Sequence, residues 1–205
     1  MDDANNHLSA PTPPAEQAQI TLARFHETVL PHLDAAYNFA RFLSRDPDAS
    51  QDIVQESFLR AYRSFWQYRG GDARFWIFAI VRNSYRSWAQ GERRKARVEF
   101  PLPGNPDSGN EAEGPAAHAF ACDQDTPEMA LIRKSESLRV REVIGMLPEA
   151  MREILVLREF EDFSYRQISE IIEVPIGTVM SRLARARHEF GLAWKALGND
   201  QGSLS

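Results

Sequence analysis

The amino-acid sequence predicts an all-α protein built from two small helical domains, which a flexible acidic linker joins. Apolar residues recur at helical spacing through most of the chain. The alternating β-branched runs with Asn-Gly or Asp-Gly turns that mark strands are missing from the sequence. An abrupt change of charge between residues 60–97 and 98–128 separates the two domains, and the 205 residues suffice for two small cores.

Three helical stretches occupy the first half of the chain. In LPHLDAAYNFARFLSR, Pro31 suits a first helical turn, and apolar residues fall on one stripe. In DPDASQDIVQESFLRAYRSF, Asp48 or Ser50 can cap a helix whose apolar side chains recur every three or four residues. The segment YRGGD then interrupts the pattern, and a proline-free run from Ala73 to about Lys95 predicts the third helix.

Four further helices are predicted in the second half. Turn residues separate them, namely Pro148, an EDF tripeptide and the pair Val174-Pro175. The helices are expected over residues 128–146, 149–160, 164–172 and 176–195.

The last two of these helices have the layout of a helix-turn-helix. Ile168 and Ile172 would face inward from the first helix, as Val179 and Leu183 would from the second. A second helix that presents small polar and arginine side chains can enter the major groove of DNA, although a solvated amphipathic helix is the alternative. The outward positions are Thr178, Ser181, Arg182, Arg185 and Arg187.

Two residues of this motif are unusual. Glu173 occupies the turn position at which glycine is common, so a left-handed backbone there would cost about 1 kcal/mol. Ser169 stands where the two helices approach most closely and where alanine would be expected. We expect the motif to tolerate both residues.

The net charge of −5 conceals two oppositely charged segments. Residues 60–97 contain ten basic and two acidic residues. Residues 98–128 contain seven acids, five prolines and three glycines, with no lysine or arginine. We expect the basic segment to meet a polyanion, and the acidic segment to be a flexible linker that can compete with that polyanion.

The basic segment also interleaves aromatic residues with its arginines, in YRGGDARFWIFAIVRNSYRSWAQGERRKAR. Single-stranded nucleic acid is held by this combination, because bases stack on aromatic rings while cations neutralise phosphates. The alternative is that the apolar side chains fill a core. We favour the core interpretation for Phe75, Ile77, Phe78, Ile80 and Val81, and it stays open for Trp76, Asn83 and Trp88.

Several function classes are not supported by the sequence. A single cysteine, Cys122, excludes an internal disulfide and favours a reducing cytoplasm. No signal peptide or apolar run long enough to cross a membrane is apparent, so neither export nor membrane insertion is expected. The five histidines are scattered, and we expect no catalytic residues, no metal and no cofactor.

Three motifs, taken together and in order, resemble the extracytoplasmic-function sigma factors of bacterial RNA polymerase. They are DIVQESFLRAYRSF, FWIFAIVRN and LPEAMREILVLREFEDFSYRQISEIIEVPIGTVMSRLARAR. The resemblance implies a transcription initiation factor that binds core polymerase, recognises a promoter and opens it. It divides the chain into a disordered tail (1–19), a region 2 domain (20–97), an acidic linker (98–127), a region 4 domain (128–197) and a second tail (198–205).

The resemblance also assigns the site residues and partners. One face of the second helix would dock on core polymerase, whose largest-subunit clamp helices and second-largest subunit are the expected partners: Asp52, Gln55, Glu56 and Leu59. The minus-10 element of promoter DNA would be captured and melted by Tyr68, Arg69, Trp76, Arg82, Asn83 and Arg86. The minus-35 element would be read by Ser164, Thr178, Ser181, Arg182 and Arg185.

Some questions stay open at this point. Many relatives carry an aspartate near Ser87 and a basic residue at Met180, so no DNA contact is assigned to these two positions. A helix-turn-helix regulator that acts without polymerase is the alternative function, although it would leave the aromatic and basic segment without a role. The sequence does not decide the promoter motif, the inducing signal or whether an anti-sigma factor binds the chain.

Overall fold

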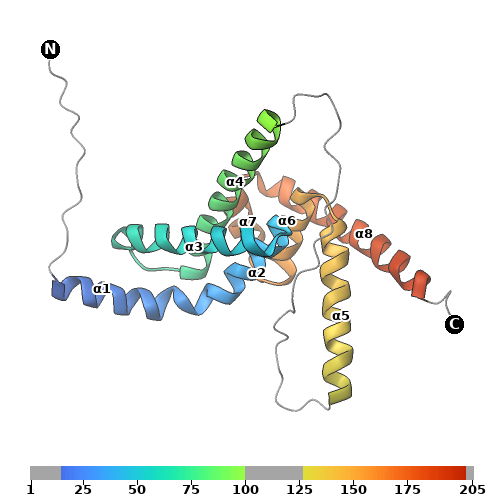
Figure 1. Cartoon of the computed structure of the whole chain (residues 1–205), viewed down its shortest axis with the longest axis horizontal. Coiled ribbons are helices and arrows are strands. Elements are labelled where there is room, and N and C mark those ends of the chain that lie inside the picture. Colours follow the sequence, from blue (N-terminus) through green and yellow to red (C-terminus); the bar gives the residue numbers. More distant parts are fainter. Residues whose placement is uncertain (1–14, 100–126, 202–205) are drawn as a thin grey trace.

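The computed structural model describes residues 15–99 and 127–201 (Figure 1). Within these two ranges the chain forms eight α-helices and two short 3₁₀ helices, Leu30–His32 and Phe65–Gln67, and no strand. The predicted all-α fold with two helical domains is therefore confirmed. Residues 100–126, which make up most of the predicted acidic linker, and the chain ends 1–14 and 202–205 lie outside the described residues.

Four α-helices form the N-terminal domain. They are α1 (Ala15–Thr28), α2 (Leu33–Ser44), α3 (Pro47–Ser64) and α4 (Ala73–Glu99). Helix α1 begins inside the segment 1–19, which the sequence predicts as a disordered tail. Phe25 and Val29, at the end of α1 and just after it, are buried, which anchors this helix to the domain.

Helices α2, α3 and α4 pack against one another and enclose the core of the N-terminal domain. Phe39 of α2 stacks on Phe78 of α4, with 5.2 Å between ring centroids, and both side chains are fully buried. The N-cap of α3 is Asp46, whose carboxylate accepts hydrogen bonds from two backbone amides of the first turn. The prediction of Asp48 or Ser50 as the cap is wrong, because Pro47 already takes the first helical position.

The C-terminal domain consists of α5 (Pro127–Met146), α6 (Glu149–Glu159), α7 (Tyr165–Ile172) and α8 (Ile176–Gln201). Helices α7 and α8 form the helix-turn-helix. Ser164 and Gln167 cap the start of α7 reciprocally, which satisfies backbone amides that the helix itself leaves unpaired. The predicted inward residues of the motif are buried: Ile168, Ile172, Val179 and Leu183.

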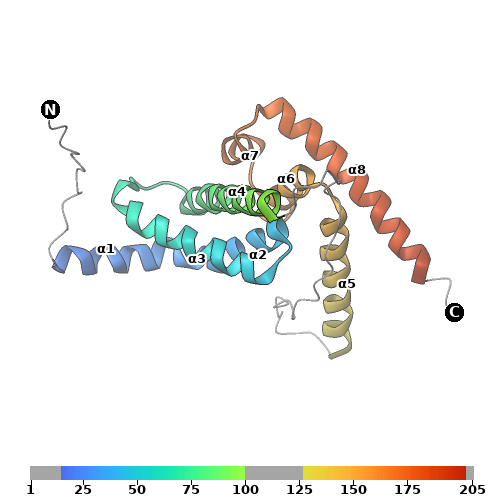
Figure 2. The same cartoon turned by 45° about the horizontal axis from the view of Figure 1, so that its top comes forward.

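The two domains lie against each other, with α6 and α7 beside α4 in both views (Figures 1 and 2). Phe163, in the turn before α7, packs edge-on against Phe78 with 5.1 Å between ring centroids. The ring centroid of Phe160, at the end of α6, lies 5.4 Å from that of Phe42 in α2. The buried residues of the two domains consequently form one continuous hydrophobic cluster.

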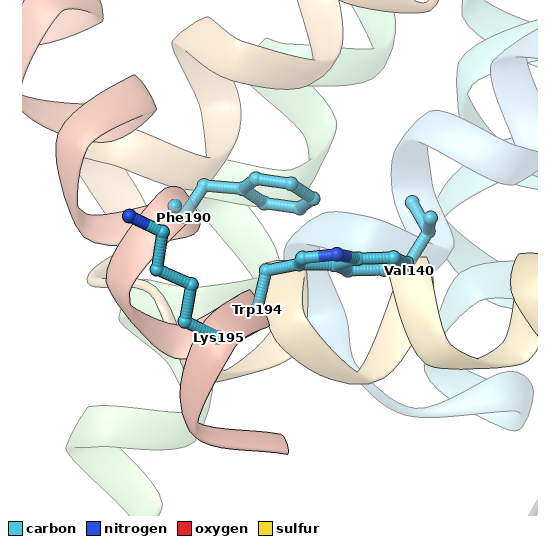
Figure 3. Close-up of a pocket in the computed structure, with 5 residues that line it drawn as sticks. Val140, Phe190, Trp194 and Lys195 are labelled. Carbon is cyan, nitrogen blue, oxygen red and sulfur yellow. The ribbon is translucent and has the colours of Figure 1, made fainter. Parts of the chain in front are cut away.

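Helices α5 and α8 leave a shallow apolar groove between them (Figure 3). Val140, Phe190, Gly191, Trp194 and Lys195 line it, and its volume is about 350 Å³. The rings of Phe190 and Trp194 stack at 5.9 Å, and the guanidinium of Arg139 lies 4.2 Å from the Trp194 ring. These contacts hold the end of α8 against α5.

Candidate nucleic-acid interface

One face of α3 carries the four residues assigned to polymerase docking. Asp52, Gln55 and Leu59 are exposed, and Glu56 is half-buried. Their spacing of three and four positions places them on a single helical face. Glu56 also accepts a hydrogen bond from Arg60 at 2.7 Å. Leu59 is 46% exposed, so its apolar side chain is accessible on this face among the polar ones.

Tyr68 belongs to an aromatic cluster at the end of α3. Its ring stacks on Phe65 at 5.5 Å and lies 5.1 Å from the ring of Trp76. Its hydroxyl donates to the carbonyl of Gly71 at 2.6 Å, across the loop before α4. Gly70 and Gly71 both have positive φ, which glycine adopts at little cost. Tyr68 is thus half-buried and helps to hold the loop, whereas Arg69 beside it is exposed.

The remaining minus-10 residues divide between two faces of α4. Trp76 and Asn83 are seven positions apart, which places them on one face. Arg82 and Arg86, four positions apart, lie on another. Asn83 is exposed, whereas Arg82 is buried. The structure therefore brings Tyr68 and Trp76 together and places the two arginines on the side that meets the C-terminal domain.

Arg82 and Arg86 make their contacts with the C-terminal domain. Arg82 donates to the carboxylate of Glu153 at 3.1 Å and to the carbonyl of Ile172 at 2.9 Å. Arg86 donates to the carboxylate of Glu173 at 3.0 Å, and the same carboxylate lies 3.5 Å from Arg82. Two residues expected to contact DNA are thus paired with carboxylates in this arrangement.

Other polar contacts join the same two surfaces. We call Arg74, Arg82, Arg86 and Arg93 the basic face of α4. Three further pairs connect the domains: Arg74 with Glu161, Arg93 with Glu149 at 3.3 Å, and Gln167 with Asp72 at 3.0 Å. Every cation in these contacts comes from α4, so the C-terminal domain meets the basic face mainly with carboxylates.

Two of these carboxylates are strongly desolvated. Burial raises the pKa of Glu153 above its ordinary value, although Arg82 opposes the shift. Burial likewise raises the pKa of Glu161, against the hydrogen bond from Arg74. In each case burial is the main cause of the raised pKa, and the paired arginine acts in the opposite direction.

The outward surface of the helix-turn-helix holds the residues assigned to the minus-35 element. Ser181 and Arg185 are exposed, and Thr178 and Arg182 are half-buried. Ser164 is exposed at the start of α7, where its hydroxyl accepts from the backbone amide of Gln167. The first four lie within two turns of α8, an arrangement that suits a major groove.

Arg187, the other outward arginine of α8, is held within the domain. Its Nε and Nη2 donate to the carboxylate of Glu159 at 2.9 and 2.6 Å. That hydrogen-bonded pair raises the pKa of Arg187. Arg187 is therefore less available to DNA than Arg182 and Arg185.

The turn between α7 and α8 has the two features that the sequence singles out. Glu173 has φ 57°, so its backbone is left-handed, at a cost of about 1 kcal/mol for a residue other than glycine. The Ser169 hydroxyl donates to the carbonyl of Val174 at 2.5 Å, which gives this small side chain a role that alanine lacks.

Two features of the described residues bear on other functions. Across residues 15–99 and 127–201 no group of three or more His, Cys, Asp or Glu side chains is placed to hold a metal ion. None of the helices in this part of the chain is both long and apolar enough to span a membrane.

Comparison with known proteins assigns the two domains. Residues 28–95 match the family model described as Sigma-70 region 2, and residues 137–189 match Sigma-70, region 4. The chain is 36% identical over 148 residues to the ECF RNA polymerase sigma-E factor of Haemophilus influenzae, covering 72% of this chain and 74% of that protein. The chain belongs to the extracytoplasmic-function sigma factor family. As a sigma factor, it serves transcription initiation.

Other similar proteins support the same family assignment. It is 34% identical over 157 residues to the RNA polymerase sigma-H factor of Pseudomonas aeruginosa, covering 74% of this chain and 76% of that protein. Among solved structures, the sigma factor RpoE of Bartonella quintana, in complex with the anti-sigma factor NepR, matches with a TM-score of 0.66. That match has 25% identity and covers 84% of this chain and 97% of the other. The alternative of a regulator that acts without polymerase is not favoured, because region 2 accounts for the N-terminal domain.

The contacts between the two domains of the sigma factor are the feature that sequence reasoning missed. The carboxylates concerned are Glu149, Glu153, Glu161 and Glu173. One signal could have pointed to them, since a basic helix in one domain has acids of the other domain, these four among them, as possible partners. No local pattern links these carboxylates to their hydrogen-bonded arginines, which stand 56 to 87 positions away.

Proposed function

We propose that this sigma factor binds core RNA polymerase through the exposed face of α3, with Leu59 as its apolar centre and Asp52, Gln55 and Glu56 around it. The clamp helices of the largest subunit are the expected contact, and the second-largest subunit is a further one. An exposed leucine among polar side chains supports the proposal, because large apolar side chains at the centre of an interface supply much of its binding energy. Recognition of the minus-10 and minus-35 elements is assigned to other surfaces, namely the Tyr68 loop with α4 and the helix-turn-helix.

At the minus-10 element, we infer that the loop around Tyr68 and the face of α4 with Trp76 and Asn83 capture an unpaired base. Arg69, Arg82 and Arg86 would contact the phosphates of the same strand. Aromatic rings, an exposed amide and arginines on adjoining surfaces support this assignment, because an extruded base needs stacking and hydrogen bonds to offset lost pairing.

At the minus-35 element, α8 would enter the major groove. Thr178, Ser181, Arg182 and Arg185 would contact base edges or phosphates, and Ser164 would approach the backbone from the start of α7. The observation that carries the whole proposal is that one chain combines this helix-turn-helix with the aromatic and basic helix α4. A duplex-binding regulator would need only the first.

We infer further that the sigma factor works in the cytoplasm, where its polymerase is, and has no catalytic activity of its own. Membership of a family of initiation factors supports both statements. An anti-sigma factor is a further proposed partner, on the strength of the similar sigma factor from Bartonella quintana, which is in complex with one.

Reconstitution with core polymerase tests the proposal. The holoenzyme should enrich a defined set of promoter fragments from genomic DNA, whereas the free chain should enrich none at physiological salt. Specific enrichment by the free chain alone would contradict the requirement for polymerase.

A further inference from the structure

Glu173 combines two local features that disfavour a glutamate at its position. Its backbone is left-handed, which glycine tolerates better than any other residue. It also places a negative charge at the C-terminal end of α7, where the helix dipole favours cations. Its side chain is 61% exposed, so burial of the stem does not compensate. A gain elsewhere must account for an acid at this site.

That gain is contact with the basic face of α4. The Glu173 carboxylate lies 3.0 Å from Arg86 and 3.5 Å from Arg82. The carbonyl of Ile172, at the end of the same helix, accepts a hydrogen bond from Arg82. The carbonyl end of α7 therefore points at Arg82, and the Glu173 carboxylate reaches both Arg82 and Arg86.

The contact between Arg82 and Glu173 leaves one donor of Arg82 without an acceptor. Nη1 of Arg82 is buried and makes no hydrogen bond to any described residue, and the Glu173 carboxylate, 3.5 Å away, is too distant to supply one. A phosphate oxygen brought close to Arg82 would provide the acceptor that this nitrogen lacks.

We propose that Glu173 acts as an intramolecular competitor of promoter DNA. In the free sigma factor it occupies the position on Arg82 and Arg86 that phosphates of the unpaired minus-10 strand would take. The closed arrangement and strand capture then exclude each other, so the C-terminal domain must leave the basic face of α4 before the promoter can open. This inference rests on the proposed minus-10 role of the two arginines.

Glu173→Gln tests the proposal, with Glu170→Gln as the matched control. Glu170 is exposed on the same helix and pairs with Arg166 of α7, not with α4. Both variants lose one negative charge from α7, but only the first loses the contact with Arg86. Each is made in the full-length chain with Cys122→Ser, and fluorophores are placed on cysteines that replace the exposed residues Arg63 and Glu189.

Two measurements are made on each free variant. Energy transfer between the fluorophores reports whether the domains are together. Anisotropy of a short fluorescent oligothymidylate reports binding of a single strand. Because an exposed ion pair contributes little, Glu173→Gln should lower the energy transfer and tighten oligothymidylate binding by about two- to fivefold. Glu170→Gln should match the parent protein, and adding oligothymidylate to the parent should lower its energy transfer.

Identical behaviour of the two variants in both measurements would overturn the proposal. A more open Glu173→Gln without tighter binding would also overturn it, because opening would then not be what limits strand capture. Failure of the proposed minus-10 function has a different signature, in which no variant binds the strand and Arg86→Ala changes nothing.

Glu173→Gly separates the proposal from a purely structural role in the turn. Glycine relieves the left-handed strain at this position, so the melting temperature should stay the same or rise. The energy transfer should nevertheless fall as it does in Glu173→Gln. A glycine variant that stays as closed as the parent would show that the carboxylate does not hold the domains together.

Discussion

The guanidinium of Arg82 lies 3.1 Å from the carboxylate of Glu153, across 71 positions of the sequence. Their side chains are only 9% and 12% exposed. This pair joins a helix of region 2 to a helix of region 4, and water is almost excluded from it. The junction of the two domains is therefore expected to respond strongly to the loss of either partner.

Glu153→Ala should lower the free energy of unfolding by about 3 kcal/mol, because it removes the buried carboxylate that is hydrogen-bonded to the Arg82 guanidinium. Urea unfolding followed by circular dichroism measures the change. Glu170→Ala removes a carboxylate from an exposed pair and should cost less than about 1 kcal/mol. Equal losses for the two variants would show that Arg82 finds another partner in region 4.

Glu161 should make stability depend on pH in a direction opposite to that of an ordinary surface ion pair. Burial raises its pKa in the folded chain. Its contribution is thus fully present below the ordinary carboxyl pKa of about 4.3 and is lost as the pH rises through the raised value. The difference in unfolding free energy between the parent protein and Glu161→Gln should favour the parent most at acid pH.

The measurement is a series of urea titrations of both proteins from about pH 4 to pH 7. A difference that stays constant over this range would mean that Glu161 titrates normally. A difference that grows in favour of the parent as pH rises would mean that Arg74 outweighs burial, with a lowered pKa.

Leu59→Ala should weaken binding to core polymerase by about tenfold, as loss of an apolar interface centre does. Leu22 of α1 is a matched control, because it is 47% exposed and Leu59 is 46% exposed. Leu22→Ala should bind core polymerase as the parent protein does. Surface plasmon resonance with immobilised core enzyme gives both affinities. Equal affinities would show that Leu59 is not the centre of the docking face.

Arg182→Ala and Arg185→Ala should each weaken holoenzyme binding to a promoter by about 1–3 kcal/mol if the arginine reads a base edge. A phosphate contact would instead weaken binding to all sequences alike. Arg187→Ala makes the same charge change on α8, but Arg187 is already paired with Glu159, so its effect should be smaller. Filter binding at fixed salt compares them, and a larger effect at Arg187 would contradict the assignment.

Asn83→Ala should slow promoter opening without changing stability or binding to core polymerase, because Asn83 is exposed on α4. Tyr68→Ala is expected to lower stability as well, since its ring packs on Phe65 and Trp76. Permanganate footprinting of unpaired thymines measures opening, and a melting curve measures stability. A template already mismatched over the minus-10 region should partly rescue Asn83→Ala, and an equal loss on both templates would count against base capture.

The helices could be predicted from the sequence because the signals that form them are local. The apolar spacing of Ile168, Ile172, Val179 and Leu183 predicted the inward face of the helix-turn-helix, and all four are buried. The cap of α3 was misplaced because Asp48 and Ser50, like Asp46, are residue types that cap helices, and the sequence alone does not rank the three. The start of α1 was missed because its anchors, Phe25 and Val29, stand at the far end of the helix.

The contact between the domains could not be predicted in the same way. Arg86 and Glu173 lie 87 positions apart, and nothing near either residue identifies the other. The basic segment was interpreted as a surface for a polyanion, with the acidic linker as its competitor. Among the described residues, the acids that pair with the basic face of α4 are carboxylates of region 4. The roles of the proposed site residues stay predictions.

The packing of Phe78 against Phe163 has a consequence for synthesis on the ribosome. Arg74, one turn before Phe78, is made 87 residues before its partner Glu161. At roughly 5 to 20 residues per second, region 2 waits about 4 to 17 seconds before the surface that covers it has been translated. During that time the nascent chain exposes Phe78, Arg74 and the rest of the region 2 surface that region 4 later covers, so this surface is open to other molecules before its own partner exists.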